Sequence, residues 1–186
     1  GVRLRPYTEK TPKPLLDILG KPMIEVIIGK LIKAGLSNFY ISIGYLGNQI
    51  KEYLGDGSKY DISITYLEED YPLGTAGTLG SPLLKNTKEL LIHNADIICE
   101  MDYTSFINQH VSDSGCCSMV VREHSIENPF GVVETHGLEI TNIIEKPIYK
   151  SFVAAGIYMI GSETRKLVEE NKYLDMPELF LKAKEN

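Results

Sequence analysis

The sequence predicts an α/β fold, because short runs of β-forming residues alternate along the chain with segments of helical period. Three β-rich runs occupy Phe39 to Ile43, Ile62 to Leu67 and Leu90 to His93. After Gly115 the pattern changes to strand candidates separated by turn residues. The second half is therefore expected to add β structure to a sheet that begins in the first half.

The segment from Met23 to Ala34 is expected to form a helix packed on this sheet. Pro22 favours the start of the helix and Gly35 favours its end. The apolar residues of the segment fall on one helical face: Ile24, Ile27, Ile28, Leu31 and Ile32.

The other elements follow the same two periods. Further helices are expected at Asn48 to Leu54, Thr75 to Leu83, Tyr103 to His110 and Glu163 to Glu170. Strands are expected at Cys117 to Arg122, Phe130 to Glu134, Ile140 to Glu145 and Phe152 to Ile160. Because no linker, low-complexity tract or repeat divides the 186 residues, we expect a single domain over residues 1–186. The chain starts in a loop-like segment without a preceding strand, so this domain is expected to be truncated at its amino-terminal end.

Composition narrows the classes of partner and the compartment. A formal net charge of -6 argues against binding to nucleic acid, which usually requires a basic face, but it allows a small phosphorylated substrate. No apolar stretch is long enough to cross a bilayer and no signal peptide opens the chain, so no membrane partner is expected. Cys99, Cys116 and Cys117 lack metal-site spacing and are expected to be reduced thiols of a cytoplasmic protein. A homo-oligomer is compatible with this composition.

The first cluster of candidate functional residues lies at the amino terminus. Residues 1–6 contain Gly1 and Arg3, and Lys13 stands between two prolines in residues 11–15. A glycine allows backbone amides to approach a polyphosphate, and Arg and Lys neutralise charge on a leaving pyrophosphate. The alternative is a solvated basic loop held by prolines.

Four further segments occur in order along the chain. They are Pro72 to Gly77, Asn94 to Asp96, Glu145 to Pro147 and Ala155 to Tyr158. Together with the amino-terminal loop, they resemble the motifs of the sugar-1-phosphate nucleotidylyltransferase family over nearly the whole chain. The bacterial members that form GDP-sugars, such as mannose- and glucosamine-1-phosphate guanylyltransferases, are the most similar subgroup.

The resemblance implies a Rossmann-like three-layer α/β/α domain with a mixed, mostly parallel central sheet, the nucleotide-diphospho-sugar transferase fold. It implies that a nucleoside monophosphate moves from a nucleoside triphosphate to a hexose 1-phosphate and that pyrophosphate is released. Arg3 and Lys13 would then stabilise the transferred charge, and Gly1, Gly74 and Thr75 would contact the nucleotide. Asp96, which follows a predicted strand, would bind Mg²⁺ together with substrate phosphates.

The resemblance also assigns base and sugar contacts. Glu69 stands five positions before Gly74, where many relatives read the nucleobase, and a carboxylate pairs naturally with the N1–H and N2–H₂ donors of guanine. GTP is therefore the expected nucleotide, with uridylyl or thymidylyl transfer as the alternative. The sugar-phosphate contacts are assigned to Gly131, Glu145, Lys146 and Gly156.

Several departures keep other interpretations open. Val2 replaces the threonine of the family motif, and Ala154 replaces an asparagine. Relatives also have a strand before the first loop and a second metal-binding aspartate beyond residues 175–180. The resemblance therefore implies that the domain is truncated at both ends. The chain as given is expected to hold half of the metal site and to be inactive in that form. A non-catalytic sugar-nucleotide-binding regulatory subunit is the rival from another class. A dinucleotide oxidoreductase is disfavoured because no G-x-G-x-x-G follows a strand.

Overall fold

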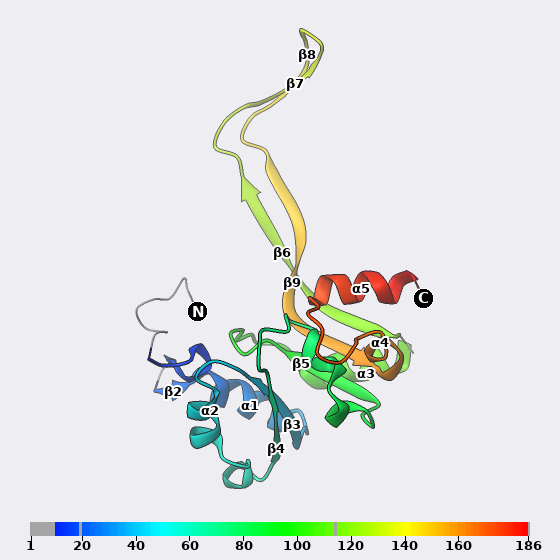
Figure 1. Cartoon of the computed structure of the whole chain (residues 1–186). Helices are drawn as coiled ribbons and strands as arrows, with labels where there is room; N and C mark the ends of the chain where they lie inside the picture. Colours follow the sequence, from blue (N-terminus) through cyan, green and yellow to red (C-terminus); the bar gives the residue numbers. More distant parts are fainter. Residues whose placement is uncertain (1–9, 19, 114, 186) are drawn as a thin grey trace. The chain divides into compact units, whose positions relative to one another are not determined.

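The computed structural model describes residues 10–18, 20–113 and 115–185 (Figure 1). These residues form two compact units. One unit consists of the described residues up to Ser118 together with those from Tyr158 onward, and the other spans Met119–Ile157.

The larger unit begins with the 3-10 helix η2 (Lys13–Leu15) and the antiparallel pair β1 (Asp17–Ile18) and β2 (Lys21–Pro22). Helix α1 (Met23–Lys33) follows directly, and Gly35 after it adopts a φ of 90°. This confirms the expected helix and both of its end signals. The apolar face is buried as predicted, through Ile24, Ile27, Ile28 and Leu31.

The next four elements build the first core. They are β3 (Asn38–Ile43), α2 (Gly47–Leu54), the 3-10 helix η3 (Ser58–Tyr60) and β4 (Ser63–Glu68). β3 and β4 are parallel neighbours, with Asn38 opposite Ser63 and Ile43 opposite Glu68. The core cluster draws on α1, β3, α2 and the start of β4, and consists of Ile24, Ile28, Ile43, Ile50, Leu54, Ile62 and Ile64.

A three-stranded sheet completes this unit. Its strand order is β5-β9-β6, from β5 (Glu89–His93), β9 (Ile148–Gly161) and β6 (Cys117–Glu127), and β6 and β9 each have residues in both units. The helices are α3 (Tyr103–Asp113), α4 (Ser162–Arg165) and α5 (Met176–Glu185). Strands and helices alternate along the chain, which confirms the α/β class. Every helix in the described ranges is too short or too polar to cross a lipid bilayer.

Two expected helices are wrong. Residues 75–83 instead form the short 3-10 helices η4 (Gly77–Gly80) and η5 (Pro82–Leu84), because the glycines of this segment pack against another stretch of backbone, as described below. The helix expected from Glu163 to Glu170 ends at Arg165. The amides of Leu167 and Val168 bond three residues back, which tightens the chain into turns.

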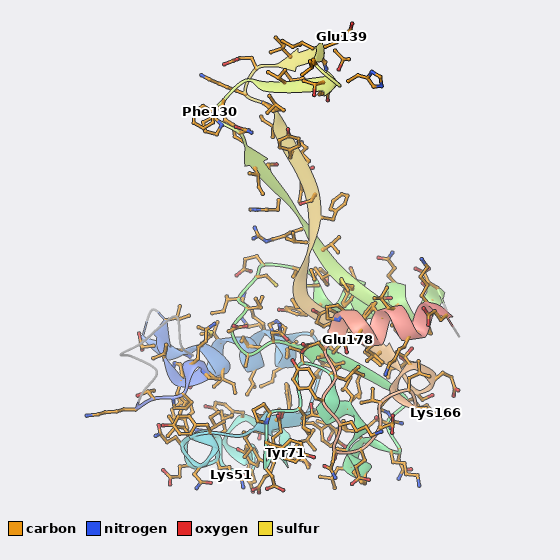
Figure 2. All side chains as sticks on the ribbon, turned by 45° about the horizontal axis from the view of Figure 1, so that its top comes forward. Lys51, Tyr71, Phe130, Glu139, Lys166 and Glu178 are labelled. Carbon is orange, nitrogen blue, oxygen red and sulfur yellow. The ribbon has the colours of Figure 1, made fainter. Side chains whose placement is uncertain are left out.

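The smaller unit contains a β-hairpin together with most of β6 and β9. Strands β7 (Val132–His136) and β8 (Glu139–Ile144) pair antiparallel, with Val132 opposite Ile144, and Gly137 supplies the positive φ of the turn. This confirms the two expected strands with small shifts in their bounds. Phe130 and Glu139, labelled in Figure 2, both belong to this unit.

Candidate functional site

An ion pair joins two of the residues that the sequence singled out. The Nζ atom of Lys13 lies 2.5 Å from Oδ2 of Asp96, although 83 residues separate them in the chain. Lys13 is presented by η2 after Pro12, and Asp96 follows the end of β5. Both side chains are partly exposed, at 32% and 42%. A ligand from solvent can therefore reach the ammonium and the carboxylate together.

A partly buried polar network supports the loop that carries Asp96. The Nδ1 atom of His93 lies 2.9 Å from the carbonyl oxygen of Asn94, and Nε2 lies 3.0 Å from the hydroxyl of Tyr103. Because a carbonyl only accepts, Nδ1 carries the proton and Nε2 accepts from Tyr103. Burial lowers the pKa of His93, which favours this neutral ring. The sequence interpretation gave this histidine no role, since its spacing resembles no metal motif.

Asp96 is the candidate magnesium ligand, and its surroundings fit a site shared with substrate. In the described ranges, no group of three His, Cys, Asp or Glu side chains could hold a metal ion by itself. Mg²⁺ commonly takes only one or two protein carboxylates and completes its shell with water and substrate phosphates. A single accessible carboxylate beside a lysine suits that requirement.

Glu69 is held by two hydrogen bonds at the end of β4. Its Oε2 atom accepts from the amide of Leu73 at 3.0 Å, and its Oε1 atom accepts from the hydroxyl of Ser42 on β3. Its own amide donates to the carbonyl of Ile43 at 2.9 Å. Each carboxylate oxygen can accept more than one hydrogen bond, so both oxygens retain capacity for a ligand donor. The sequence did not indicate the contribution of Ser42.

The loop that contains Gly74 and Thr75 is fixed by Asp175. The Thr75 amide donates to Oδ1 of Asp175 at 2.9 Å, and the Thr75 hydroxyl lies 3.1 Å from the same atom. That hydroxyl also accepts from the amide of Met176 at 2.8 Å, at the start of α5. The hydrogen bonds from the Thr75 amide, the Tyr173 hydroxyl and the Thr75 hydroxyl lower the pKa of Asp175. Both polar groups of Thr75 are thus engaged within the protein, and its contact with a nucleotide stays a prediction.

Three glycines in this loop pack directly on the backbone of residues 169–174. A Cβ atom on Gly74 would lie 2.5 Å from the carbonyl oxygen of Leu174, and Gly74 adopts a φ of 77°. A Cβ on Gly77 would lie 2.5 Å from the carbonyl oxygen of Lys172, and one on Gly80 would lie 2.6 Å from that of Glu169. The glycine spacing of three residues was the available sequence signal for this contact. Tyr71, labelled in Figure 2, adds a hydrogen bond from its hydroxyl to the carbonyl of Asn171 at 2.7 Å.

The four residues assigned to the sugar phosphate lie in the hairpin unit. A Cβ on Gly131 would lie 2.9 Å from Oε2 of Glu145, so only glycine lets this carboxylate lie so close. Lys146 has a φ of 45°, an uncommon value for a residue with a side chain, and Gly156 has a φ of 75°. Such conformations often occur at functional sites. Gly1 and Arg3 lie outside the described residues, so their assigned contacts stay predictions.

The chain was compared with known families and proteins. A family model described as nucleotidyl transferase matches residues 1–182. The mannose-1-phosphate guanyltransferase of Saccharomyces cerevisiae is 33% identical over 181 residues, which covers 91% of this chain and 49% of that protein. The N-acetylmuramate alpha-1-phosphate uridylyltransferase of Neisseria meningitidis is 39% identical over 122 residues, which covers 60% of this chain and 52% of that protein.

A solved structure from Bacillus anthracis, described as a candidate glucose-1-phosphate thymidylyltransferase, has a similar fold. It aligns with a TM-score of 0.76 at 25% identity and covers 99% of this chain and 78% of that one. The chain spans about half the length of the curated relatives it matches.

Proposed function

The chain belongs to the nucleotidyl transferase family, and we propose that it transfers a nucleoside monophosphate from a nucleoside triphosphate to a hexose 1-phosphate, with release of pyrophosphate. The observation that carries this proposal is the accessible Lys13–Asp96 pair. A phosphate-binding cation and a carboxylate suited to magnesium are the two groups that such a transfer requires at one place.

The proposed chemistry is an in-line attack by a phosphate oxygen of the sugar phosphate on the α-phosphorus. Lys13 would exchange its bond to Asp96 for a bond to a triphosphate oxygen and so offset the charge that develops on the leaving pyrophosphate. Arg3 is proposed to act with it. Mg²⁺, when held by Asp96, would supply further charge neutralisation at the phosphates. Positioning and electrostatics are sufficient for this reaction, so it requires no nucleophilic side chain.

Guanine is the proposed base. Glu69 presents two carboxylate oxygens that Ser42 and the Leu73 amide hold in place, and guanine offers two adjacent N–H donors to such a pair. The guanyltransferase name of the Saccharomyces relative supports this choice. The uridylyltransferase name of the Neisseria relative keeps UTP as the alternative substrate, and dTTP is a further alternative.

The sugar phosphate is proposed to bind the hairpin unit. Glu145 would accept hydrogen bonds from sugar hydroxyls, Lys146 would hold the attacking phosphate, and Gly131 and Gly156 would allow close approach. The three free cysteines suit a reducing compartment, and the cytoplasm remains the expected location.

A pyrophosphate-release assay on the full-length protein tests the proposal, because the chain as given is expected to be inactive. GTP, UTP and dTTP would each be supplied with Mg²⁺ and with mannose, glucose or glucosamine 1-phosphate. Asp96→Asn is expected to lower the rate at least about a hundredfold, as loss of a charge-stabilising group typically does. Glu163→Gln, which changes an exposed carboxylate paired with Lys166 on α4, is the matched control and should retain the rate.

Titration calorimetry with the same nucleotides separates catalysis from binding alone. Tight nucleotide binding by the full-length protein without pyrophosphate release would favour the non-catalytic regulatory subunit. Absence of both binding and release would contradict the proposal altogether.

A further inference from the structure

Two adjacent cysteines bring their sulfur atoms together at the start of β6. The Sγ atoms of Cys116 and Cys117 lie 3.9 Å apart, and both residues are free thiols. Neighbouring side chains in an extended strand point to opposite faces. Cys116 precedes the strand, which begins at Cys117, so its side chain escapes that alternation. The result is a pair of thiols in near contact.

The backbone that carries this pair is anchored. The carbonyl oxygen of Cys116 accepts a hydrogen bond from the amide of Gly161 at 3.0 Å and another from the hydroxyl of Thr164 at 2.8 Å. Thr164 is itself buried, with 2% of its surface exposed. On the residue that follows the pair, the hydroxyl of Ser118 lies 2.7 Å from Nδ1 of the buried His110. The peptide between the two cysteines and the residue after them are therefore anchored, which favours the close approach of the two sulfurs.

The two thiols differ in reactivity. Cys116 is exposed, whereas Cys117 is partly buried, and burial followed by the neighbouring Cys116 raises the pKa of Cys117 to about 11. Because the thiolate is the reactive form, Cys116 is the thiol that attacks a reagent first. Cys117 then reacts within the same complex, where its high effective concentration offsets its small thiolate fraction.

We propose that Cys116 and Cys117 form a vicinal dithiol site that binds trivalent arsenicals and similar thiol-seeking centres through both sulfurs. With an arylarsenoxide, two As–S bonds replace the As=O bond, the two S–H bonds break, and the two protons leave with the oxygen as water. Arsenic stays trivalent, so the reaction needs no oxidant or reductant. This site is separate from the residues proposed for nucleotidyl transfer, and its test does not depend on that activity.

Phenylarsine oxide is the probe. After incubation with an excess of the monothiol glutathione, intact-mass measurement of the chain should show one retained phenylarsenic group. Thiol titration should show that both thiols of the pair are consumed while Cys99, whose sulfur lies 3.5 Å from the Tyr103 hydroxyl, remains. Addition of the dithiol 2,3-dimercaptopropanol should then remove the arsenic.

Single substitutions identify the thiols. Cys116→Ser and Cys117→Ser should each lose the retained arsenical, because a single thiol cannot hold it against glutathione, and Cys99→Ser should keep it. Retention by either Cys116→Ser or Cys117→Ser would overturn the proposal. So would a wild-type chain that retains no arsenical or that loses only one thiol, a result that needs no variant to fold.

Discussion

Replacement of Gly77 by alanine tests whether backbone-to-backbone packing holds the loop of residues 73–80. The added Cβ would lie 2.5 Å from the carbonyl oxygen of Lys172, 2.9 Å from Cβ of Leu73 and 3.4 Å from the amide nitrogen of Leu174. The closest of these atoms belongs to the backbone, which cannot move aside as the end of a flexible side chain can. Gly77 is not among the glycines with positive φ, so the substitution adds a steric clash without conformational strain.

The loss of stability in Gly77→Ala depends on which contacts must separate to admit the added Cβ. To relieve the clash, residues 172–174 must move away, which weakens the bonds from the Ala76 and Gly77 amides to the carbonyl of Leu174, at 2.9 and 3.1 Å. Overpacking costs about 1–3 kcal/mol, and each weakened hydrogen bond adds up to about 1 kcal/mol. We expect a loss of about 2–4 kcal/mol in the free energy of unfolding.

Urea denaturation followed by circular dichroism measures this change. Gly29→Ala is the matched control, since Gly29 lies inside α1 and an added Cβ would meet no atom within 4 Å. That control should stabilise the chain by about 0.5–1 kcal/mol, because alanine favours a helix over glycine. A Gly77→Ala chain as stable as the wild type would refute the packing argument.

Three further predictions concern the site. Lys13→Ala is expected to lower the rate of pyrophosphate release about a hundredfold or more, whereas Lys166→Ala, which breaks an exposed pair on α4, should leave it unchanged. Glu69→Gln should reduce the preference for GTP over ITP, whose base lacks the 2-amino group, and calorimetric dissociation constants for both nucleotides would show this. Burial lowers the pKa of His93 from its usual 6.5, so the unfolded chain takes up this proton at a higher pH than the folded chain does. The neutral ring therefore contributes stability above about pH 6.5, and this contribution is lost as the pH falls through the lowered pKa. His93→Gln should therefore make the denaturation midpoint fall less steeply between about pH 7.5 and pH 5.5 than it does in the wild type. Equal pH dependence in the two proteins would contradict the assignment. In that assignment, Asn94 and Tyr103 form hydrogen bonds with the ring, and the charge of Asp96 opposes the lowering of its pKa.

The sequence predicted correctly those helices and strands whose end residues and apolar pattern lie within the segment itself. Helix α1 combines a proline at its start, a glycine at its end and one apolar face, and all three features act within residues 22–35. The same reasoning failed for residues 75–83. Their helical period was real, but the glycines there serve contacts with residues about ninety to a hundred positions later in the chain, which a local pattern does not reveal.

The candidate site likewise contains residues that the sequence predicted and residues that it missed. The family resemblance assigned Lys13 and Asp96 to the same phosphate site, whereas the ion pair between them, 83 positions apart, was not predicted. The supporting residues Ser42, His93 and Asp175 were missed, since each acts through side-chain hydrogen bonds that no sequence motif marks.

Asp175 illustrates why such supports matter for function. Its carboxylate binds both polar groups of Thr75, and Thr75 in turn accepts from the first amide of α5. The loop of residues 73–80 is thereby fastened at one end by side-chain hydrogen bonds and along its length by the glycine contacts. Because Leu73 in this loop also donates to Glu69, a shift of residues 169–175 would move the proposed base-reading carboxylate as well. Nucleotide choice and stability of the loop are therefore expected to change together, so Gly77→Ala should weaken GTP binding even though Gly77 has no proposed contact with the base.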